Sequence, residues 1–185
     1  MSPCQDRPRV RRHGKTSPAR EPGRPMVGAR ALSAGAKGCY IAVVPGTAVR
    51  PYSPSDADAC ARVFARAWHA GHAYAPRTID LAVFVAETRG ESVLVAEAAG
   101  RGVVAFASVH RPGSFVHHLY VDPAAQGLGI GRMLLDRAVA LAGGRASLKC
   151  QCRNAQALAF YRHLGWTEGE RGDGEFGPWT RLHSP

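Results

Sequence analysis

The 185-residue sequence contains no apolar run long enough to cross a membrane, and it has few acidic residues and few cysteines. A membrane-spanning helix needs about 20 consecutive apolar residues, so none is expected. The first residues also lack the apolar segment of a secretory signal. The five cysteines are an odd number without even spacing, which argues against a disulfide framework and favours a reducing cytoplasm. Cys150 and Cys152 have no second pair to complete a zinc site, so no metal is expected.

The shortage of acidic residues is concentrated at the start of the chain. Residues 1–46 hold nine of the 24 Lys and Arg but only two of the 14 Asp and Glu, which leaves 15 against 12 in the remainder. A net charge of only +3 there gives no reason to expect nucleic-acid binding. Residues 1–46 are also rich in Pro and Gly and have no interleaved aromatic residues. We therefore expect a disordered basic tail, with Met26 as a later start, rather than a nucleic-acid-binding arm.

The hydrophobic pattern predicts a single mixed α/β domain over residues 47–185. Alternating apolar runs and turn residues predict strands at 48–52, 92–98, 103–110, 115–121 and 146–152, with final strands near Trp166 and at 178–182. Helical periodicity predicts helices at 55–70, after Pro76, at 130–142 and at 154–164.

A glycine-rich loop joins the expected strand 115–121 to the expected helix 130–142. The chain passes from the apolar strand through a proline turn to Gly127, Gly129 and Gly131, and the helix begins at once. Such a junction gathers free backbone N–H groups at a helix N-terminus, where a phosphate binds. Because glycine has no Cβ, the phosphate can approach the backbone closely.

Two common nucleotide-binding patterns fail at this loop. A P-loop requires Lys and Ser or Thr after its last glycine, but Arg132 and Met133 follow Gly131. A dinucleotide fingerprint requires a third glycine where Arg132 stands, and it opens a βαβ unit rather than following a fourth strand.

The remaining pattern, Gln126-x-x-Gly129-x-Gly131, resembles motif A of the GCN5-related N-acetyltransferase (GNAT) superfamily, Gln/Arg-x-x-Gly-x-Gly/Ala. A second motif of that family is an Asn followed by Phe-Tyr and then by Gly and an aromatic residue. In this chain it reads Asn154, Phe160-Tyr161 and Gly165-Trp166. Residues 50–59 also look like the first strand and helix start of the family, so the resemblance covers about residues 47–183.

The resemblance implies an α/β acyl-CoA N-acyltransferase fold with a mostly antiparallel twisted sheet, splayed middle strands and helices on both faces. It also implies acetyl-CoA as co-substrate and no metal. The main chain of Leu119, Tyr120 and Val121 is then expected to bind the pantetheine amides and polarise the thioester carbonyl. The remaining cofactor-binding residues are expected to be Gln126, Gly127, Leu128, Gly129, Ile130, Gly131, Arg132, Asn154 and Tyr161, with the pyrophosphate on the loop and Arg132 adding a charged hydrogen bond.

The same resemblance implies the catalytic residues. Tyr161 matches the tyrosine that protonates the leaving thiolate, although periodicity alone predicts a core aromatic. The usual glutamate base is missing at residues 115–116, which leaves His118, His117 or an ordered water, and we prefer His118. Neighbouring side chains on a regular strand point to opposite faces, so we expect at most one of these histidines to face the acceptor.

Together these features predict a cytoplasmic N-acetyltransferase that acts by direct attack of a small-molecule or peptide amine on acetyl-CoA. The alternative of another class is a non-catalytic acetyl-CoA-binding or sensing module with the same fold. The acceptor stays open, because the segments expected to line its cleft, residues 68–74 and 172–179, carry no recognisable pattern. No membrane or nucleic-acid partner is expected, whereas a homodimer is compatible with the family.

Overall fold

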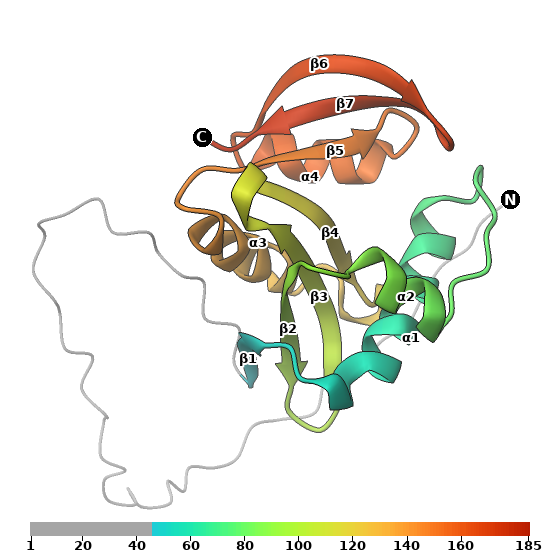
Figure 1. Cartoon of the computed structure of the whole chain (residues 1–185), viewed down its shortest axis with the longest axis vertical. Coiled ribbons are helices and arrows are strands. Elements are labelled where there is room, and N and C mark those ends of the chain that lie inside the picture. The colour runs from blue at the N-terminus through green and yellow to red at the C-terminus, as the bar shows by residue number, and fades with distance from the viewer. Residues whose placement is uncertain (1–45) are drawn as a thin grey trace, which may run out of the picture. The chain divides into compact units, whose positions relative to one another are not determined.

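The computed structural model describes residues 46–185, and the tail expected over residues 1–46 lies outside them except for Gly46. Strands and helices alternate much as the sequence predicts (Figure 1). The strands are β1 (Thr47–Pro51), β2 (Ser92–Ala98), β3 (Gly102–His110), β4 (Phe115–Val121), β5 (Ser147–Gln151), β6 (Thr167–Gly174) and β7 (Gly177–His183). The α-helices are α1 (Ala57–Gly71), α2 (Leu81–Glu87), α3 (Ile130–Leu141) and α4 (Ala155–His163). No helix in this described part is long and apolar enough to cross a bilayer.

The seven strands form one sheet in the order β1-β2-β3-β4-β5-β7-β6. All neighbours run antiparallel except β4 and β5, which are parallel and share a single register pair, Phe115 with Ser147. Beyond that pair the two strands diverge, whereas β4 stays paired with β3 as far as Val121. The expected mixed fold with splayed middle strands is therefore confirmed.

The helices cover both faces of the sheet and create two cores. Val95 and Phe106 point toward α1 and α2, whereas their neighbours Ala96, Ala105 and Ala107 point toward α3. This alternation is the normal consequence of the two-residue repeat of a strand. The small alanine side chains allow α3, which follows the glycine-rich loop, to lie close to the middle of the sheet.

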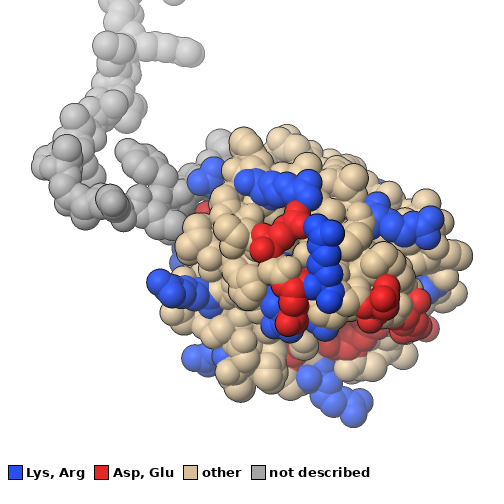
Figure 2. Space-filling model, turned by 90° about the horizontal axis from the view of Figure 1, so that it is seen from above, with Lys and Arg blue, Asp and Glu red and all other residues tan. Residues whose placement is uncertain are grey.

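The polar hairpin at the C-terminus extends further than its sequence suggests. β6 reads Thr-Glu-Gly-Glu-Arg-Gly-Asp-Gly, without apolar alternation, yet it pairs with β7 from Thr167–His183 to Gly174–Gly177. An edge strand rich in charge is disfavoured from pairing with other chains. On the face shown in Figure 2, basic and acidic residues are intermixed rather than gathered by sign.

Candidate active site

The glycine-rich loop lies at the C-terminal end of β4 and opens α3. Gly127 and Gly129 have φ angles of +76° and +80°, in the left-handed region that favours glycine. The first helical bond runs from the Met133 N–H to the Gly129 carbonyl, at 3.1 Å. Within residues 46–185, no protein acceptor is found for the N–H groups of residues 127–132. Free donors at the positive end of a helix dipole suit a phosphate group.

The side chain of Gln126 links this loop to the preceding strand by a hydrogen bond. Its Nε2 donates to the Val121 carbonyl at 3.1 Å, and its Oε1 accepts from Gln156 of α4 at 3.4 Å. A Cβ on Gly131 would lie 3.5 Å from Val121 and 3.6 Å from Phe160, so strand, loop and α4 meet here. The side chain of Arg132 is half-exposed beside the loop, and its one charged neighbour among residues 46–185 is Asp136, at 3.9 Å. It is therefore free to reach an anion.

The main chain of β4 alternates between its two neighbours. The Asp122 N–H donates to the Val104 carbonyl of β3 at 2.8 Å. Because antiparallel bonding alternates along a strand, Tyr120 also bonds toward β3, whereas Leu119 and Val121 direct their main-chain groups toward β5. On that side the strands have separated. Leu119 and Val121 thus present main-chain groups to the gap, and Tyr120 does not.

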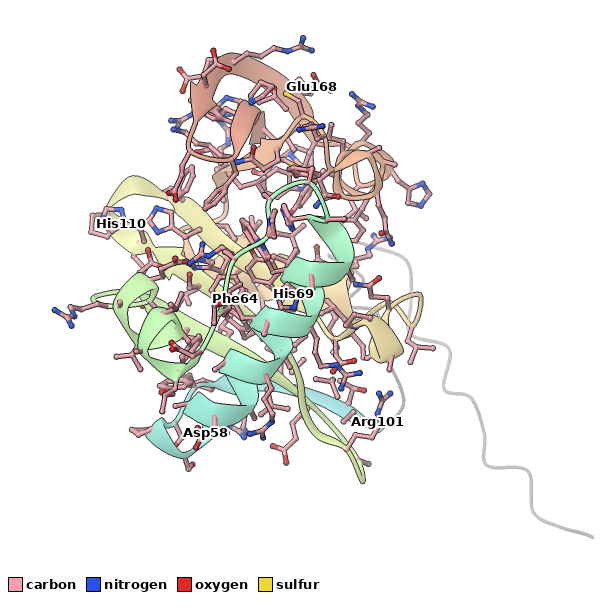
Figure 3. All side chains as sticks on the ribbon, turned by 90° about the vertical axis from the view of Figure 1, so that its right-hand side faces the viewer. Asp58, Phe64, His69, Arg101, His110 and Glu168 are labelled. Carbon is pink, nitrogen blue, oxygen red and sulfur yellow. The ribbon has the colours of Figure 1, made fainter. Side chains whose placement is uncertain are left out.

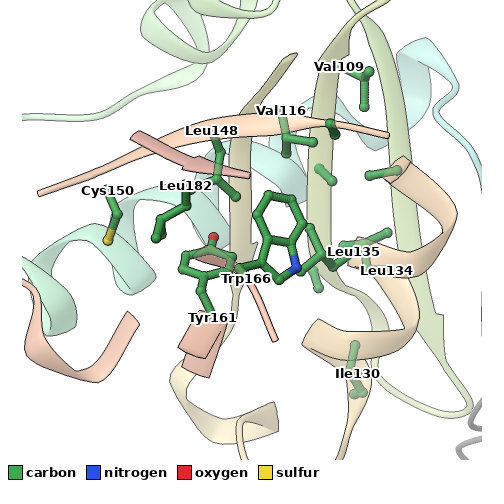
Figure 4. Close-up of a cluster of buried hydrophobic side chains, with 14 of the residues drawn as sticks. Val109, Val116, Ile130, Leu134, Leu135, Leu148, Cys150, Tyr161, Trp166 and Leu182 are labelled. Carbon is green, nitrogen blue, oxygen red and sulfur yellow. The ribbon is translucent and has the colours of Figure 1, made fainter. Parts of the chain in front are cut away.

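Tyr161 lies in the core between the sheet and the helices α3 and α4, with Trp166 at 5.6 Å (Figure 4). Only 7% of it is exposed, and no hydrogen-bond partner of its hydroxyl is found in the described part of the chain. Burial, with smaller effects of Cys150 and Tyr120, raises the pKa of Tyr161 far above the ordinary value of a tyrosine. A phenol with so high a pKa stays protonated at neutral pH, which suits a proton donor rather than a base.

Asn154 has a structural role that its position in the motif does not predict. Its Oδ1 accepts from the Ala157 N–H at 3.0 Å and caps α4. Its Nδ2 lies beside the end of α1, where a Cβ on Gly71 would be 3.3 Å away. The cap thereby fixes the start of the helix that carries Tyr161.

His118 points toward α1 and α2 and is engaged at both ring nitrogens. Nδ1 lies 2.7 Å from Ser108 Oγ, and Nε2 lies 3.2 Å from Glu87 Oε2. Glu87 also bonds to Arg77, and the hydrogen bond from His118, more than the one from Arg77, lowers the pKa of this carboxyl. His118 is thus held in a polar chain of four side chains.

The expectation that His117 and His118 lie on opposite faces is wrong, because β4 carries a β-bulge. Ser108 pairs with His118 and Val109 with Val116, which leaves His117 without a partner on β3. A bulge adds one residue and breaks the alternation of side chains. The His117 ring lies 4.7 Å from Phe115 and 6.2 Å from His118, on the same face as α2. Nothing in the sequence predicts this extra residue.

On that face, α1 and the loop after it meet the tip of the β6–β7 hairpin (Figure 3). The Arg77 guanidinium lies 5.1 Å from the Trp68 ring and 5.4 Å from the Phe176 ring. Trp68 and Phe176 also touch edge to face, with centroids 5.0 Å apart. Two segments that the sequence leaves without a pattern are therefore neighbours, beside His118.

Cys150 and two hollows of the surface add no reactive group to this arrangement. Burial raises the pKa of Cys150 to about 12, which disfavours a thiolate nucleophile. A hollow of about 540 Å³ is lined by Arg111 and Gly143, and another of about 490 Å³ by Arg145 and His183. Residues 46–185 contain no group of three or more His, Cys, Asp or Glu that suits a metal.

Comparisons with known proteins decide the family. Residues 80–168 match the acetyltransferase (GNAT) domain family. A solved GCN5-related N-acetyltransferase from Rhodopseudomonas palustris is 26% identical, with a TM-score of 0.63, over 77% of this chain and 97% of its own. The chain therefore contains a GNAT domain. The structure of an acetyltransferase from Salmonella typhimurium with its cofactor acetyl-CoA is 24% identical, with a TM-score of 0.60 over 75% of this chain and 92% of its own.

Curated relatives of this GNAT chain match over shorter segments. A mycothiol acetyltransferase of Beutenbergia cavernae is 45% identical over 56 residues, which are 28% of this chain and 19% of that protein. An N-alpha-acetyltransferase of Mycobacterium tuberculosis is 40% identical over 74 residues, 36% of this chain and 47% of that protein. The matched segments thus span less than half of either relative.

Proposed function

We propose that this GNAT chain is an N-acetyltransferase that transfers the acetyl group of acetyl-CoA to a primary amine by direct attack. The observation that carries the proposal is the open edge of β4 beside a loop of free N–H groups. The Leu119 and Val121 main chains face the gap, and residues 127–132 lie at its end. The acetyl-CoA named for the Salmonella typhimurium structure supports this co-substrate.

The residues around the gap fit acetyl-CoA as the donor of the acetyl group. The N–H groups of residues 127–132 and the Arg132 side chain would hold the pyrophosphate. The Leu119 and Val121 main chains would pair with the pantetheine amides, as a neighbouring strand does. A main-chain N–H aimed at the thioester oxygen would stabilise the negative charge that develops there.

The reaction needs two proton transfers besides the bond changes. The ammonium of the acceptor first gives a proton to a base, for which His118 is the residue expected from the sequence. The neutral nitrogen then attacks the thioester carbon, the C–N bond forms and the C–S bond breaks. Tyr161 would donate its hydroxyl proton toward the departing thiolate and regain one from the new amide nitrogen.

Calorimetry with acetyl-CoA and a thiol-release assay across amines test this function. The amine panel contains a peptide N-terminus, a peptidyl lysine, a polyamine, an aminoglycoside and free amino acids. We expect acetyl-CoA binding and thiol release with at least one amine. Binding without release for any amine would favour the non-catalytic sensing module, and absence of binding would contradict both functions.

The name of the Mycobacterium tuberculosis relative makes a peptide N-terminus the first acceptor to assay. The mycothiol acetyltransferase name adds an amine of a small thiol compound to the panel. A cytoplasmic enzyme fits the three free cysteines of the described part, Cys60, Cys150 and Cys152.

A further inference from the structure

We propose that His117, oriented by Glu91, is the group that takes the proton from the acceptor ammonium. The proposal rests on the acetyl transfer proposed above and gives His118 a supporting place in the polar chain instead. It makes His117 a catalytic residue and Glu91 a positioning residue.

The two histidines differ in the freedom of their ring nitrogens. Both nitrogens of His118 have protein partners, and only 11% of its side chain is exposed. His117 contacts Glu91 through Nδ1, and no partner of its Nε2 is found among residues 46–185. Its side chain is 44% exposed. A base must present a lone pair to the ammonium of the acceptor, and Nε2 of His117 can present one.

Glu91 has the placement of a carboxylate that orients an imidazole. Its side chain is only 5% exposed, and its Oε2 is buried without a hydrogen-bond partner in the described part of the chain. An ionised carboxylate buried in this way is costly unless a positive charge lies next to it. Protonation of His117 supplies that charge. The contact at Nδ1 also fixes the tautomer, so that Nε2 carries the lone pair.

The charged surroundings of His117 come from several elements. Burial and the neighbouring His118 lower the pKa of His117. An ionised carboxylate beside an imidazole acts in the opposite direction, which is the effect expected of Glu91. His110 of β3 lies 6.1 Å away, and Arg181 of β7 lies over the ring of Phe115. Glu87 is already bonded to His118 and Arg77.

The bulge places His117 at the correct end of the open edge. β4 and β5 still touch at Phe115 and Ser147, and the gap begins directly after them. From Val121 to His117 the strand covers about 13 Å, a length that an extended pantetheine arm anchored at the loop can follow. An amine that enters from the α2 face then meets the imidazole first.

The proton balance is complete with these groups. The ammonium gives one proton to His117 Nε2, which becomes an imidazolium paired with Glu91. The neutral amine forms the C–N bond, and the C–S bond breaks with its electron pair on sulfur. The second proton leaves the new amide nitrogen and reaches the thiolate through Tyr161, while His117 returns its proton to solvent.

An NMR titration and kinetics of three variants test the proposal. In the full chain we expect ¹⁵N shifts that report a proton on His117 Nδ1, and in Glu91→Gln a fall of the His117 pKa by about one unit or more. In His117→Gln we expect kcat/KM at neutral pH to fall about 100-fold with the acetyl-CoA dissociation constant unchanged. The acidic limb of the profile of kcat/KM against pH should also disappear in this variant.

His163→Gln, at an exposed imidazole at the end of α4, is the matched control and should keep the wild-type profile. A proton on His117 Nε2, or an unchanged pKa in Glu91→Gln, overturns the orientation by Glu91. An active wild type whose His117→Gln variant keeps the acidic limb overturns this inference alone. A wild type that releases no thiol with any amine overturns the proposed function, and the role of His117 falls with it.

Discussion

Tyr161 combines deep burial with a hydroxyl that has no partner in the described domain. In Tyr161→Phe the ring keeps its packing against Trp166, so the fold and the acetyl-CoA affinity should be unchanged. Loss of the proton donor should lower kcat about 100-fold. Thiol release at saturating acetyl-CoA, with calorimetry as the control for binding, measures this. Unchanged turnover at unchanged affinity would remove Tyr161 from the mechanism.

Two glycines of the loop should respond to alanine in opposite ways. Gly127 has a φ of +76° and open space around a Cβ, so Gly127→Ala should lower the free energy of unfolding by about 1 kcal/mol through backbone strain. Gly131 is helical, and its Cβ would make ordinary contacts at 3.5–3.6 Å. Gly131→Ala should therefore be as stable as the wild type or about 0.5 kcal/mol more stable.

The same two variants separate stability from binding. The Cβ in Gly131→Ala would contact Val121 and Phe160. The motif accepts Ala as well as Gly at this position, so the acetyl-CoA affinity should stay near the wild-type value. Urea unfolding and calorimetry on both variants measure the two effects. A large loss of acetyl-CoA affinity in Gly131→Ala would contradict the match of this loop to the motif.

Among the elements, α4 depends on the cap that Asn154 provides. Asn154→Ala removes the acceptor of the Ala157 N–H and should destabilise the domain by about 1 kcal/mol. Asn154→Asp keeps an acceptor there and adds a favourable charge at the helix N-terminus, so its stability should match the wild type. Urea denaturation of the pair is the measurement. Equal losses in both variants would mean that Nδ2, beside Gly71, matters more than the cap.

Elements with a repeating pattern are predictable from this sequence, and local irregularities are not. The strand at Phe115–Val121 and the helix from Ile130 follow directly from periodicity and glycine placement. The bulge at His117 leaves no trace in composition, because it arises from pairing with β3. β6 was expected only near Trp166, since its charged residues depend on β7 for pairing.

The candidate site likewise has residues that the sequence predicts and residues that it does not. The spacing of the loop residues from Gln126 to Arg132 predicts their role, because glycines directly before a helix already define an anion site. Glu91 has no motif around it, and it reaches His117 only because the α2–β2 turn folds over the bulge. Contacts between segments far apart in the chain, such as that of Arg77 with Phe176, cannot be predicted from local sequence.

For the molecule as a whole, Arg50 joins the first strand to the first helix and to β2. It makes two bonds to Asp56, at 2.7 and 2.9 Å, and one to Glu97 at 2.9 Å. The hydrogen bond from Arg50 is the main cause that lowers the pKa of Asp56, with a smaller effect of the Ser53 N–H. A carboxyl whose pKa falls on folding stabilises the folded state while it is ionised.

The sign of this coupling gives a dependence of stability on pH. The stabilisation by Asp56 should be present above its unfolded pKa of about 3.9 and disappear as the pH falls through its lower folded pKa. Asp56→Asn should therefore lose about 1 kcal/mol at neutral pH and differ less from the wild type in strong acid. Urea midpoints at pH 7 and pH 3 measure this. A difference that grows in acid would contradict the assignment.

The divergence of β4 from β5 leaves main-chain groups in the middle of the sheet that only water or a ligand can satisfy. Amide hydrogens of a central strand normally exchange with solvent slowly, because the strand must open before they are released. Here the Leu119 and Val121 amides should exchange as fast as those of an edge strand, while that of Tyr120 between them stays protected. The centre of this sheet thus behaves as an edge until a ligand lies along it.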